Sequence, residues 1–217
     1  WSGCSVAAAG DVNGDGLADL IVGALGSDPA AGSSAGRSYV VFGQTGSAAI
    51  DISAIANGSG GFVINGQGAG DYSGRSVAAA GDVNGDGLAD LIVGAFASNP
   101  AAGGYVGRSY VVFGQTGGAA IDLSAIANGS GGFVINGQGA GDRSGISVAA
   151  AGDVNGDGLA DLIVGAYLSD PAAVSSAGRS YVVFGQTGSA AIDLSAVASG
   201  SGGFVINGQC AYDQSGL

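Results

Sequence analysis

Short apolar runs separated by Gly, Asn and Asp recur along the whole chain. β-Branched and aromatic residues bounded by turn residues are typical of strands, so each run predicts a β-strand. In the first repeat of this pattern the predicted strands are 5–10, 17–24, 37–43 and 61–67. Residues 51–58 predict one short helical turn, with Asp51 as its N-cap and Asn57-Gly58 at its end.

The pattern returns every 71 residues, as the positions of Asp11, Asp82 and Asp153 show. The repeats are 1–71, 72–142 and 143–213, and residues 214–217 return to the register of 1–4. Four evenly spaced antiparallel strands in each repeat are typical of a propeller blade. We therefore predict an all-β fold, a β-propeller of four-stranded antiparallel blades, in a single domain spanning 1–217.

One nine-residue loop, Asp11-Val-Asn-Gly-Asp-Gly-Leu-Ala-Asp19, recurs unchanged at 82–90 and 153–161. Its side-chain oxygens fall at positions 1, 3, 5 and 9, and the carbonyl of position 7 can complete the set. Hard oxygen ligands in a flexible loop suit Ca²⁺, so we predict three Ca²⁺ ions per chain. The predicted ligands are Asp11, Asn13, Asp15, Leu17 and Asp19 in the first loop, Asp82, Asn84, Asp86, Leu88 and Asp90 in the second, and Asp153, Asn155, Asp157, Leu159 and Asp161 in the third.

This loop has two other possible interpretations. An EF-hand needs a bidentate Glu at position 12 and helical flanks, but position 12 is Val22, Val93 or Val164 and the flanks predict strands. A turn rich in Asn, Asp and Gly that binds nothing is the simpler alternative. Three carboxylates within nine residues repel one another without a cation, which favours the metal site.

The composition excludes several classes of function. All 17 acidic residues are Asp, only five basic residues occur, and the net charge of −12 argues against nucleic acid or an anionic membrane as a partner. We expect no membrane insertion, because no apolar run approaches about 18 residues. The chain has no His, Lys or Glu, so the usual general bases are missing and we expect no enzyme.

Two further sets of polar residues recur with the repeats. Asp71, Asp142 and Asp213 predict side chains that cap their own turns, although carboxylate pairs also serve glycosidases. The arginines at the start of each third strand are expected to pair with Asp. They are Arg37, Arg108 and Arg179.

Cys4 and Cys210 are the two cysteines of the chain, and they flank the junction between its end and its beginning. We predict a Cys4–Cys210 disulfide, within one chain or between two, and therefore an oxidising, extracellular or cell-surface location. The chain starts at Trp1 with no signal peptide, so we expect a mature or excised product.

The loop, together with Phe42-Gly43 and Gly23-Ala24 at strand ends, resembles the FG-GAP repeats of the integrin α-subunit β-propeller. The resemblance implies a calcium-binding propeller that acts as an extracellular adhesion or recognition module. The chain departs from the family where Leu25, Phe96 and Tyr167 replace Pro, and in having three repeats rather than seven blades. A homodimer completing a six-bladed ring, a self-closed ring of three blades and an excerpt of a longer protein all remain open.

The connections that differ most between repeats join the second strand to the third and the fourth to the first. They lie on the face opposite the calcium loops, and loops on a rigid scaffold often carry recognition. We expect a protein or saccharide ligand there, bound through residues 25–35 and their equivalents. The alternative is a purely structural scaffold, or an excerpt of a large bacterial surface protein, without a ligand of its own.

Overall fold

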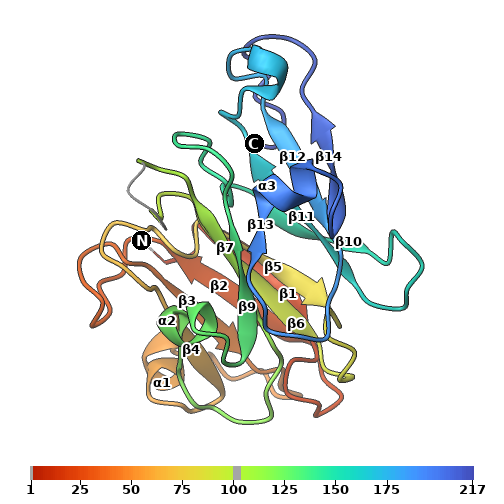
Figure 1. The fold of residues 1–217 in the computed structure, drawn as a ribbon. Helices are drawn as coiled ribbons and strands as arrows, with labels where there is room; N and C mark the ends of the chain where they lie inside the picture. Colours follow the sequence, from red (N-terminus) through yellow and green to blue (C-terminus); the bar gives the residue numbers. More distant parts are fainter. Residues whose placement is uncertain (1, 100–103) are drawn as a thin grey trace.

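The strands form three sheets in the computed structural model, which describes residues 2–99 and 104–217 (Figure 1). The first sheet contains β1 (Ser5–Gly10), β2 (Asp19–Ala24), β3 (Arg37–Val41), β4 (Gly61–Asn65) and β8 (Ile121–Asp122). The second contains β5 (Ser76–Gly81), β6 (Asp90–Ala95), β7 (Arg108–Val112), β9 (Gly132–Asn136) and β13 (Ile192–Asp193). The third contains β10 (Val148–Gly152), β11 (Asp161–Ala166), β12 (Arg179–Val183) and β14 (Gly203–Asn207). The predicted all-β fold with three repeats is confirmed.

Each repeat also carries one short helix between its third and fourth strands. The helices are α1 (Ile52–Ala56), α2 (Leu123–Ala127) and α3 (Leu194–Ala198), and a 3₁₀ turn, η1 (Pro171–Ala173), occurs in the third repeat. The helix predicted at 51–58 is confirmed, but its capping is not. Asp51 occupies the N-cap position and its side chain makes no capping hydrogen bond.

The four strands of each repeat are antiparallel, as predicted, and a fifth short strand comes from the next repeat. β8 pairs in parallel with β4, and β13 pairs in parallel with β9. These two strands were not predicted from the sequence. They tie each sheet to the repeat that follows it, while β14 in the third sheet has no such partner among the described residues.

The sheets pack face to face through two apolar clusters. One joins Phe62 and Ile64 of the first sheet to Leu91 and Val93 of the second, and an equivalent cluster joins the second sheet to the third. The innermost strands touch as well, because β5 packs between β1 and β10. Their small side chains allow this close approach.

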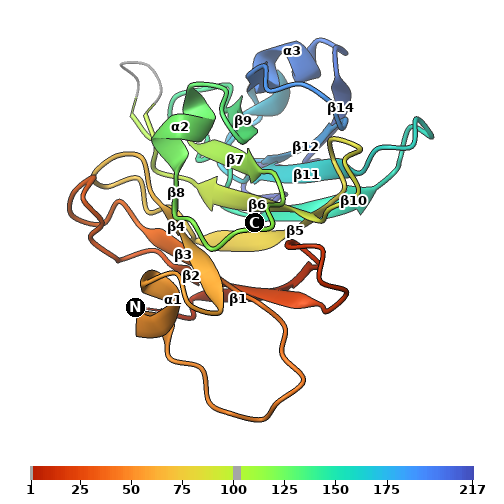
Figure 2. The ribbon, with the colours of Figure 1, turned by 90° about the horizontal axis from the view of Figure 1, so that it is seen from below.

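The three sheets follow one another in an arc, with the first and third at its two ends (Figure 2). Their outer faces stay exposed, as Val6 and Ile206 show, so the chain does not close a ring on itself. The self-closed ring of three blades was therefore a wrong alternative. Among the residues described, no helix is long and apolar enough to cross a membrane.

The two cysteines do not form a disulfide within this chain. Both thiols are free and exposed. The Cys4 Sγ atom lies 3.4 Å from the Gly23 carbonyl oxygen and 3.3 Å from that of Gly74. The intrachain form of the predicted disulfide is thus absent, and a bond between two chains stays a prediction.

Candidate metal centre

The three identical loops join β1 to β2, β5 to β6 and β10 to β11, and they project from the right and lower right of the molecule in Figure 1. Each loop turns sharply because its two glycines adopt left-handed conformations. In the first loop Gly14 has a φ of 77° and Gly16 a φ of 87°. A side chain at either position would strain the turn.

The first Asp of each loop gathers backbone N–H groups of the turn. Asp11 Oδ1 accepts hydrogen bonds from the N–H groups of Gly14 at 2.8 Å and Asp15 at 3.1 Å, and Oδ2 accepts one from Gly16 at 2.8 Å. Asp82 and Asp153 repeat this arrangement. The carboxylate of position 1 thus lies inside the loop.

Positions 3 and 5 lie against each other in the same exposed turn. Asn13 Nδ2 donates to Asp15 Oδ2 at 3.0 Å, and Asn13 Oδ1 accepts from the Asp15 N–H at 2.9 Å. Asp15 Oδ1 in turn accepts from the Leu17 N–H at 2.8 Å. The structure therefore brings the side chains of positions 1, 3 and 5 together.

Position 9 behaves differently, because its carboxylate is buried. Asp19 Oδ2 accepts from the Val12 N–H at 2.9 Å, and Oδ1 accepts from the Gly43 N–H at 2.8 Å. Asp90 and Asp161 make the same two bonds in their repeats. This Asp therefore ties the start of the loop to the end of the third strand, a structural role that sequence analysis did not predict.

The electrostatics of the second loop show the cost of this arrangement. Burial, the largest cause, and the charges of Asp86 and Asp82 together raise the pKa of Asp90 from 3.8 to about 6, against two backbone hydrogen bonds that lower it. Desolvation thus outweighs the hydrogen bonds. A nearby positive charge would relieve both the repulsion and the burial penalty.

The donor set fits a hard cation, since it consists of carboxylate, amide and carbonyl oxygens. In the residues that the structure describes, no three acidic, His or Cys side chains converge closely enough to hold an ion between them. The carboxylates instead accept hydrogen bonds from the loop backbone. The predicted ligand set and the three Ca²⁺ ions stay predictions.

The connections predicted to form a ligand face lie side by side at the opposite ends of the strands. The N–H of Gly70 donates to the carbonyl of Ser33 at 2.9 Å, and the N–H of Tyr72 donates to that of Ser34 at 3.0 Å. In the second repeat, residues 100–103 of the predicted ligand face lie outside the described residues.

An aromatic cluster occupies this face between the second and third repeats. Tyr72 and Phe96 stack with ring centroids 5.8 Å apart. The Arg143 guanidinium carbon lies 5.9 Å from the Phe96 ring centroid and 5.4 Å from that of Tyr105, and its Nη1 donates to the Tyr167 hydroxyl at 3.0 Å. All five residues stand at positions that vary between repeats. The variation was visible in the sequence, but their contact was not.

The recurring Asp and Arg side chains have mostly local partners. Asp142 Oδ2 accepts from the Gly139 N–H at 3.1 Å, and Asp213 makes the equivalent bond at 2.7 Å, so the predicted turn caps are present there. Burial raises the pKa of Asp71 and of Asp142. The arginines bond to amide side chains rather than to Asp, which corrects the expected pairing. Arg37 Nε, for example, donates to Asn65 Oδ1 at 2.8 Å.

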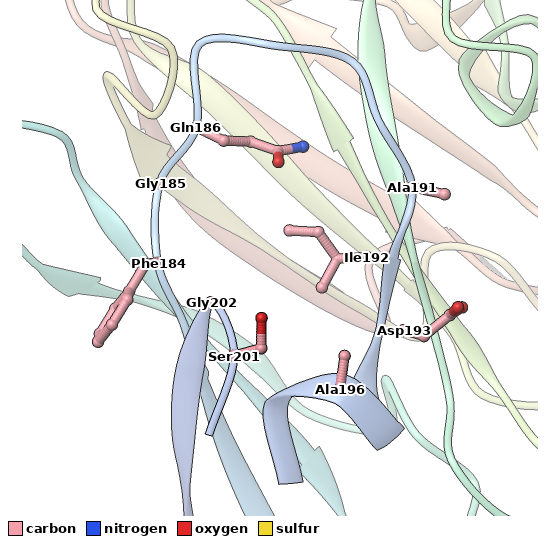
Figure 3. A pocket seen from close by; sticks show the side chains of 9 residues that line it. All are labelled: Phe184, Gly185, Gln186, Ala191, Ile192, Asp193, Ala196, Ser201 and Gly202. Carbon is pink, nitrogen blue, oxygen red and sulfur yellow. The ribbon is translucent and has the colours of Figure 1, made fainter. Parts of the chain in front are cut away.

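A pocket of about 370 Å³ lies in the third repeat between α3 and the loop that follows β12 (Figure 3). Ile192 and Ala196 form its apolar part and Gln186 lies on its loop side. An equivalent pocket of about 330 Å³ occurs in the second repeat. No predicted calcium ligand lines either one, and Asp193 at the edge already accepts a hydrogen bond from Asn136. These pockets add no further chemistry to the loops.

The chain matches the model of a known protein family. The model of the FG-GAP repeat matches the chain three times, at residues 5–41, 73–112 and 144–183. Each match begins at or just before the first strand of a repeat, contains its nine-residue loop and ends with its third strand. A search of curated proteins found no match.

Proposed function

The chain belongs to the FG-GAP repeat family, and on that premise we propose that it is an extracellular, calcium-binding recognition module. Membership indicates an integrin-like module of the β-propeller type, and repeats of this family occur in extracellular and surface proteins. Three sheets that pack face to face, with their innermost strands in contact, support an arrangement of propeller blades.

Calcium binding is supported by one observation above all, the gathering of three oxygen-bearing side chains into each exposed turn. In the first repeat Asp11, Asn13 and Asp15 would hold the ion, with the Leu17 carbonyl and Asp19 completing the set. Bound calcium supplies positive charge that offsets the repulsion among these carboxylates. Its role in this proposal is structural, since it would fix the hairpin of the two innermost strands.

Recognition is assigned to the face opposite the loops, where the aromatic cluster lies. Tyr105 is 52% exposed there, and Tyr and Arg are enriched among the residues that dominate protein interfaces. We propose a protein ligand for this face and keep a saccharide as the alternative. A scaffold without a ligand remains the second candidate function, because loop variation alone does not require binding.

The calcium proposal is tested by thermal unfolding of Asp86→Ala. Asp86 is exposed, so its loss should lower the melting temperature by several degrees in calcium and by little in chelator. The matched control is Asp28→Asn, which also removes one charge from an exposed turn. The second repeat already has Asn99 at that position, where its Oδ1 accepts the Tyr105 N–H as Asp28 accepts that of Ser34. Equal loss in both conditions would contradict the proposal.

The recognition proposal is tested on a protein and saccharide array with Tyr105→Ala and Arg143→Ala. Both variants should lose the ligand that the unchanged chain binds, while Tyr212→Ala should keep it. Tyr212 is 74% exposed on the same face but takes no part in the aromatic cluster, so it tests whether the cluster, rather than any exposed tyrosine of this face, binds the ligand. An array with no binding by the unchanged chain would favour the scaffold.

A further inference from the structure

The first sheet exposes part of a face that the other two sheets bury, since α1 covers only Tyr39, Val41 and Val63 on it. We call it the leading face, since in the second and third sheets it packs against the preceding repeat. Val6 on this face is 67% exposed, whereas its equivalents Val77 and Val148 are only 4% and 6% exposed. Leu20 is also exposed, although the Leu at its position in the other repeats is fully buried. The leading face of the first sheet is therefore built to be covered.

The third sheet exposes the opposite, or trailing, face, which the first two sheets bury against the repeat that follows. Phe204 is 40% exposed, while Phe62 and Phe133 are fully buried at the equivalent positions. Ile206 is 48% exposed, and its equivalents are fully buried. Since trailing faces pack on leading faces within the chain, the two exposed faces are complementary in shape and chemistry.

The outer edge of the third sheet lacks a strand that the first two sheets have. β8 and β13 cover the edges of β4 and β9 in parallel register. The equivalent segment of the first repeat, Ile50–Asp51, forms no strand, and the edge of β14 at Ile206–Asn207 is open in the described structure. One end of the chain thus offers the strand that the other end lacks.

Side-chain hydrogen bonds repeat the same asymmetry. Asn65 Nδ2 donates to Asp122 Oδ1 at 2.9 Å across the first junction, and the same bond crosses the second. The corresponding donor of the third repeat is Asn207, and the corresponding acceptor of the first is Asp51. Within the described part of the chain, neither has this partner.

A second polar contact also forms at both junctions within the chain and lacks its partner at each end. Gln67 Oε1 accepts from Arg108 Nη1 at 2.9 Å and from the Tyr110 hydroxyl at 2.5 Å, and the next junction has equivalent bonds. Gln209 in the third repeat has no such donor among the described residues. Arg37 in the first repeat bonds only within its own sheet.

The calcium loops also form a ladder that ends at the third repeat. The N–H of Ala89 donates to the Asp11 carbonyl at 3.1 Å, and an equivalent bond of 3.0 Å joins the second and third loops. At the two ends of this ladder, the Asp153 carbonyl is the acceptor without an equivalent donor, and the N–H of Ala18 is the donor without an equivalent acceptor, among the described residues. Val154 beside it is 48% exposed, although its equivalents are fully buried.

The exposed apolar faces, the missing edge strand and the missing hydrogen-bond partners occur in complementary pairs at the two ends of the chain. From these pairs we propose that the trailing face of the third sheet binds the leading face of the first sheet in a second copy of this chain. Two such head-to-tail contacts would close a ring of two chains and six sheets. The contact uses different surfaces on the two partners, so it is heterologous. The contact does not depend on calcium binding, because the exposed apolar residues and the groups without hydrogen-bond partners lie mainly on the sheets.

The chain ends compete for one position at this contact. The N–H groups of Gly74 and Gly145 each donate to a carbonyl of the following sheet, and Gly216, just after the third repeat, is their equivalent. In the first sheet the Gly3 N–H already occupies that carbonyl, Gly23 O, at 2.9 Å. The exposed segment Ser2–Cys4 must therefore move aside when the two copies meet.

The proposal is tested by native mass spectrometry and sedimentation with Val6→Asp and Ile206→Asp. The unchanged chain should be a dimer, and either variant should weaken association at least about 100-fold, because it buries an unpaired charge. Both residues are exposed within one chain, so each variant should fold normally by circular dichroism. Thr187→Asp adds the same charge to an exposed loop away from the trailing face and should leave the dimer intact.

Mixing the two variants gives the sharpest result. Val6→Asp keeps a normal trailing face and Ile206→Asp keeps a normal leading face, so the mixture should form heterodimers through one intact contact. A chain that stays monomeric at all concentrations, or a dimer that neither variant weakens, would overturn the proposal. Calcium counted in the same spectra reports separately on the loops, so either proposal can fail alone.

Discussion

At the scale of single residues, the four oxygen-bearing positions of each loop divide into two kinds. Positions 1, 3 and 5 lie in an exposed turn, where they can meet an ion from solvent. Position 9 is buried and already satisfies two backbone N–H groups, which would be costly to leave unpaired. The last Asp is therefore needed with or without a metal.

Asp90→Ala and Asp86→Ala should separate these roles. Asp90→Ala leaves the N–H groups of Val83 and Gly114 without acceptors, so it should lower the free energy of unfolding by about 2–5 kcal/mol even in chelator. Asp86→Ala should act mainly in calcium. Urea unfolding in both conditions measures the two free energies. An Asp90→Ala variant as stable as the unchanged chain would show that Asp90 does not hold the loop to the third strand.

The buried carboxyl groups also predict a dependence on pH. The pKa of Asp90 is raised from 3.8 to about 6, and those of Asp71 and Asp142 are also raised, so folding favours their protonated forms. Stability in chelator should be greatest below about pH 4 and fall as pH rises through about 6. Calcium should flatten the fall. Thermal melts across this pH range measure the change, and stability in chelator that rises with pH would contradict the prediction.

The sequence predicted which residues form the loops, because three identical copies of an oxygen-rich turn are a strong local signal. It did not predict the burial of position 9, since its partner Gly43 lies 24 residues from Asp19 and is brought near only by the sheet. The pairing of Arg37 with Asn65 was missed for the same reason.

At the scale of elements, the glycine after each third strand packs against the loop of its own sheet. A Cβ on Gly114 would lie 2.6 Å from Leu88 Cβ and 2.8 Å from the Ala89 carbonyl oxygen. The Phe-Gly pair of the family pattern thus has a steric cause. The Phe ring packs against the core between the sheets, and the absence of a side chain on the Gly leaves room for the loop.

Gly114→Ala should therefore destabilise the chain by about 1–3 kcal/mol, whether or not calcium is present. Gly117→Ala is the matched control in the same connection, because a Cβ there meets nothing within 4 Å. It should be neutral or stabilising by up to about 1 kcal/mol. Chemical unfolding compares the pair, and equal effects would rule out the steric account.

The strand pattern was predicted well where strands are long and apolar, as for 5–10, which coincides with β1. The strand predicted at 17–24 starts later, at Asp19, because the loop extends through Ala18. β8 and β13 could not be foreseen. Two residues give no periodic signal, and their partners belong to the preceding repeat.

At the scale of the whole molecule, the sequence predicted three repeats but could not decide whether the first and third repeats pack against each other, against a second chain or against further repeats. The open arc follows from the exposed faces of the first and third sheets, which only packing shows. That residues 1–217 form one domain, and that Cys4 and Cys210 bond between chains, stay predictions.

Charge should control association of the proposed dimer. Each chain carries a net charge of −12, so two copies repel one another at low ionic strength. Association should tighten with added salt. Sedimentation at several salt concentrations checks this, and weaker association in high salt would contradict an apolar interface.

The most direct test of calcium binding by the three loops is native mass spectrometry of the non-reduced chain before and after chelation. We predict three Ca²⁺ ions on each chain, lost together with thermal stability when a chelator is added. A chain that carries no calcium at millimolar concentration would contradict the account, and the three loops would then be turns held by their own hydrogen bonds.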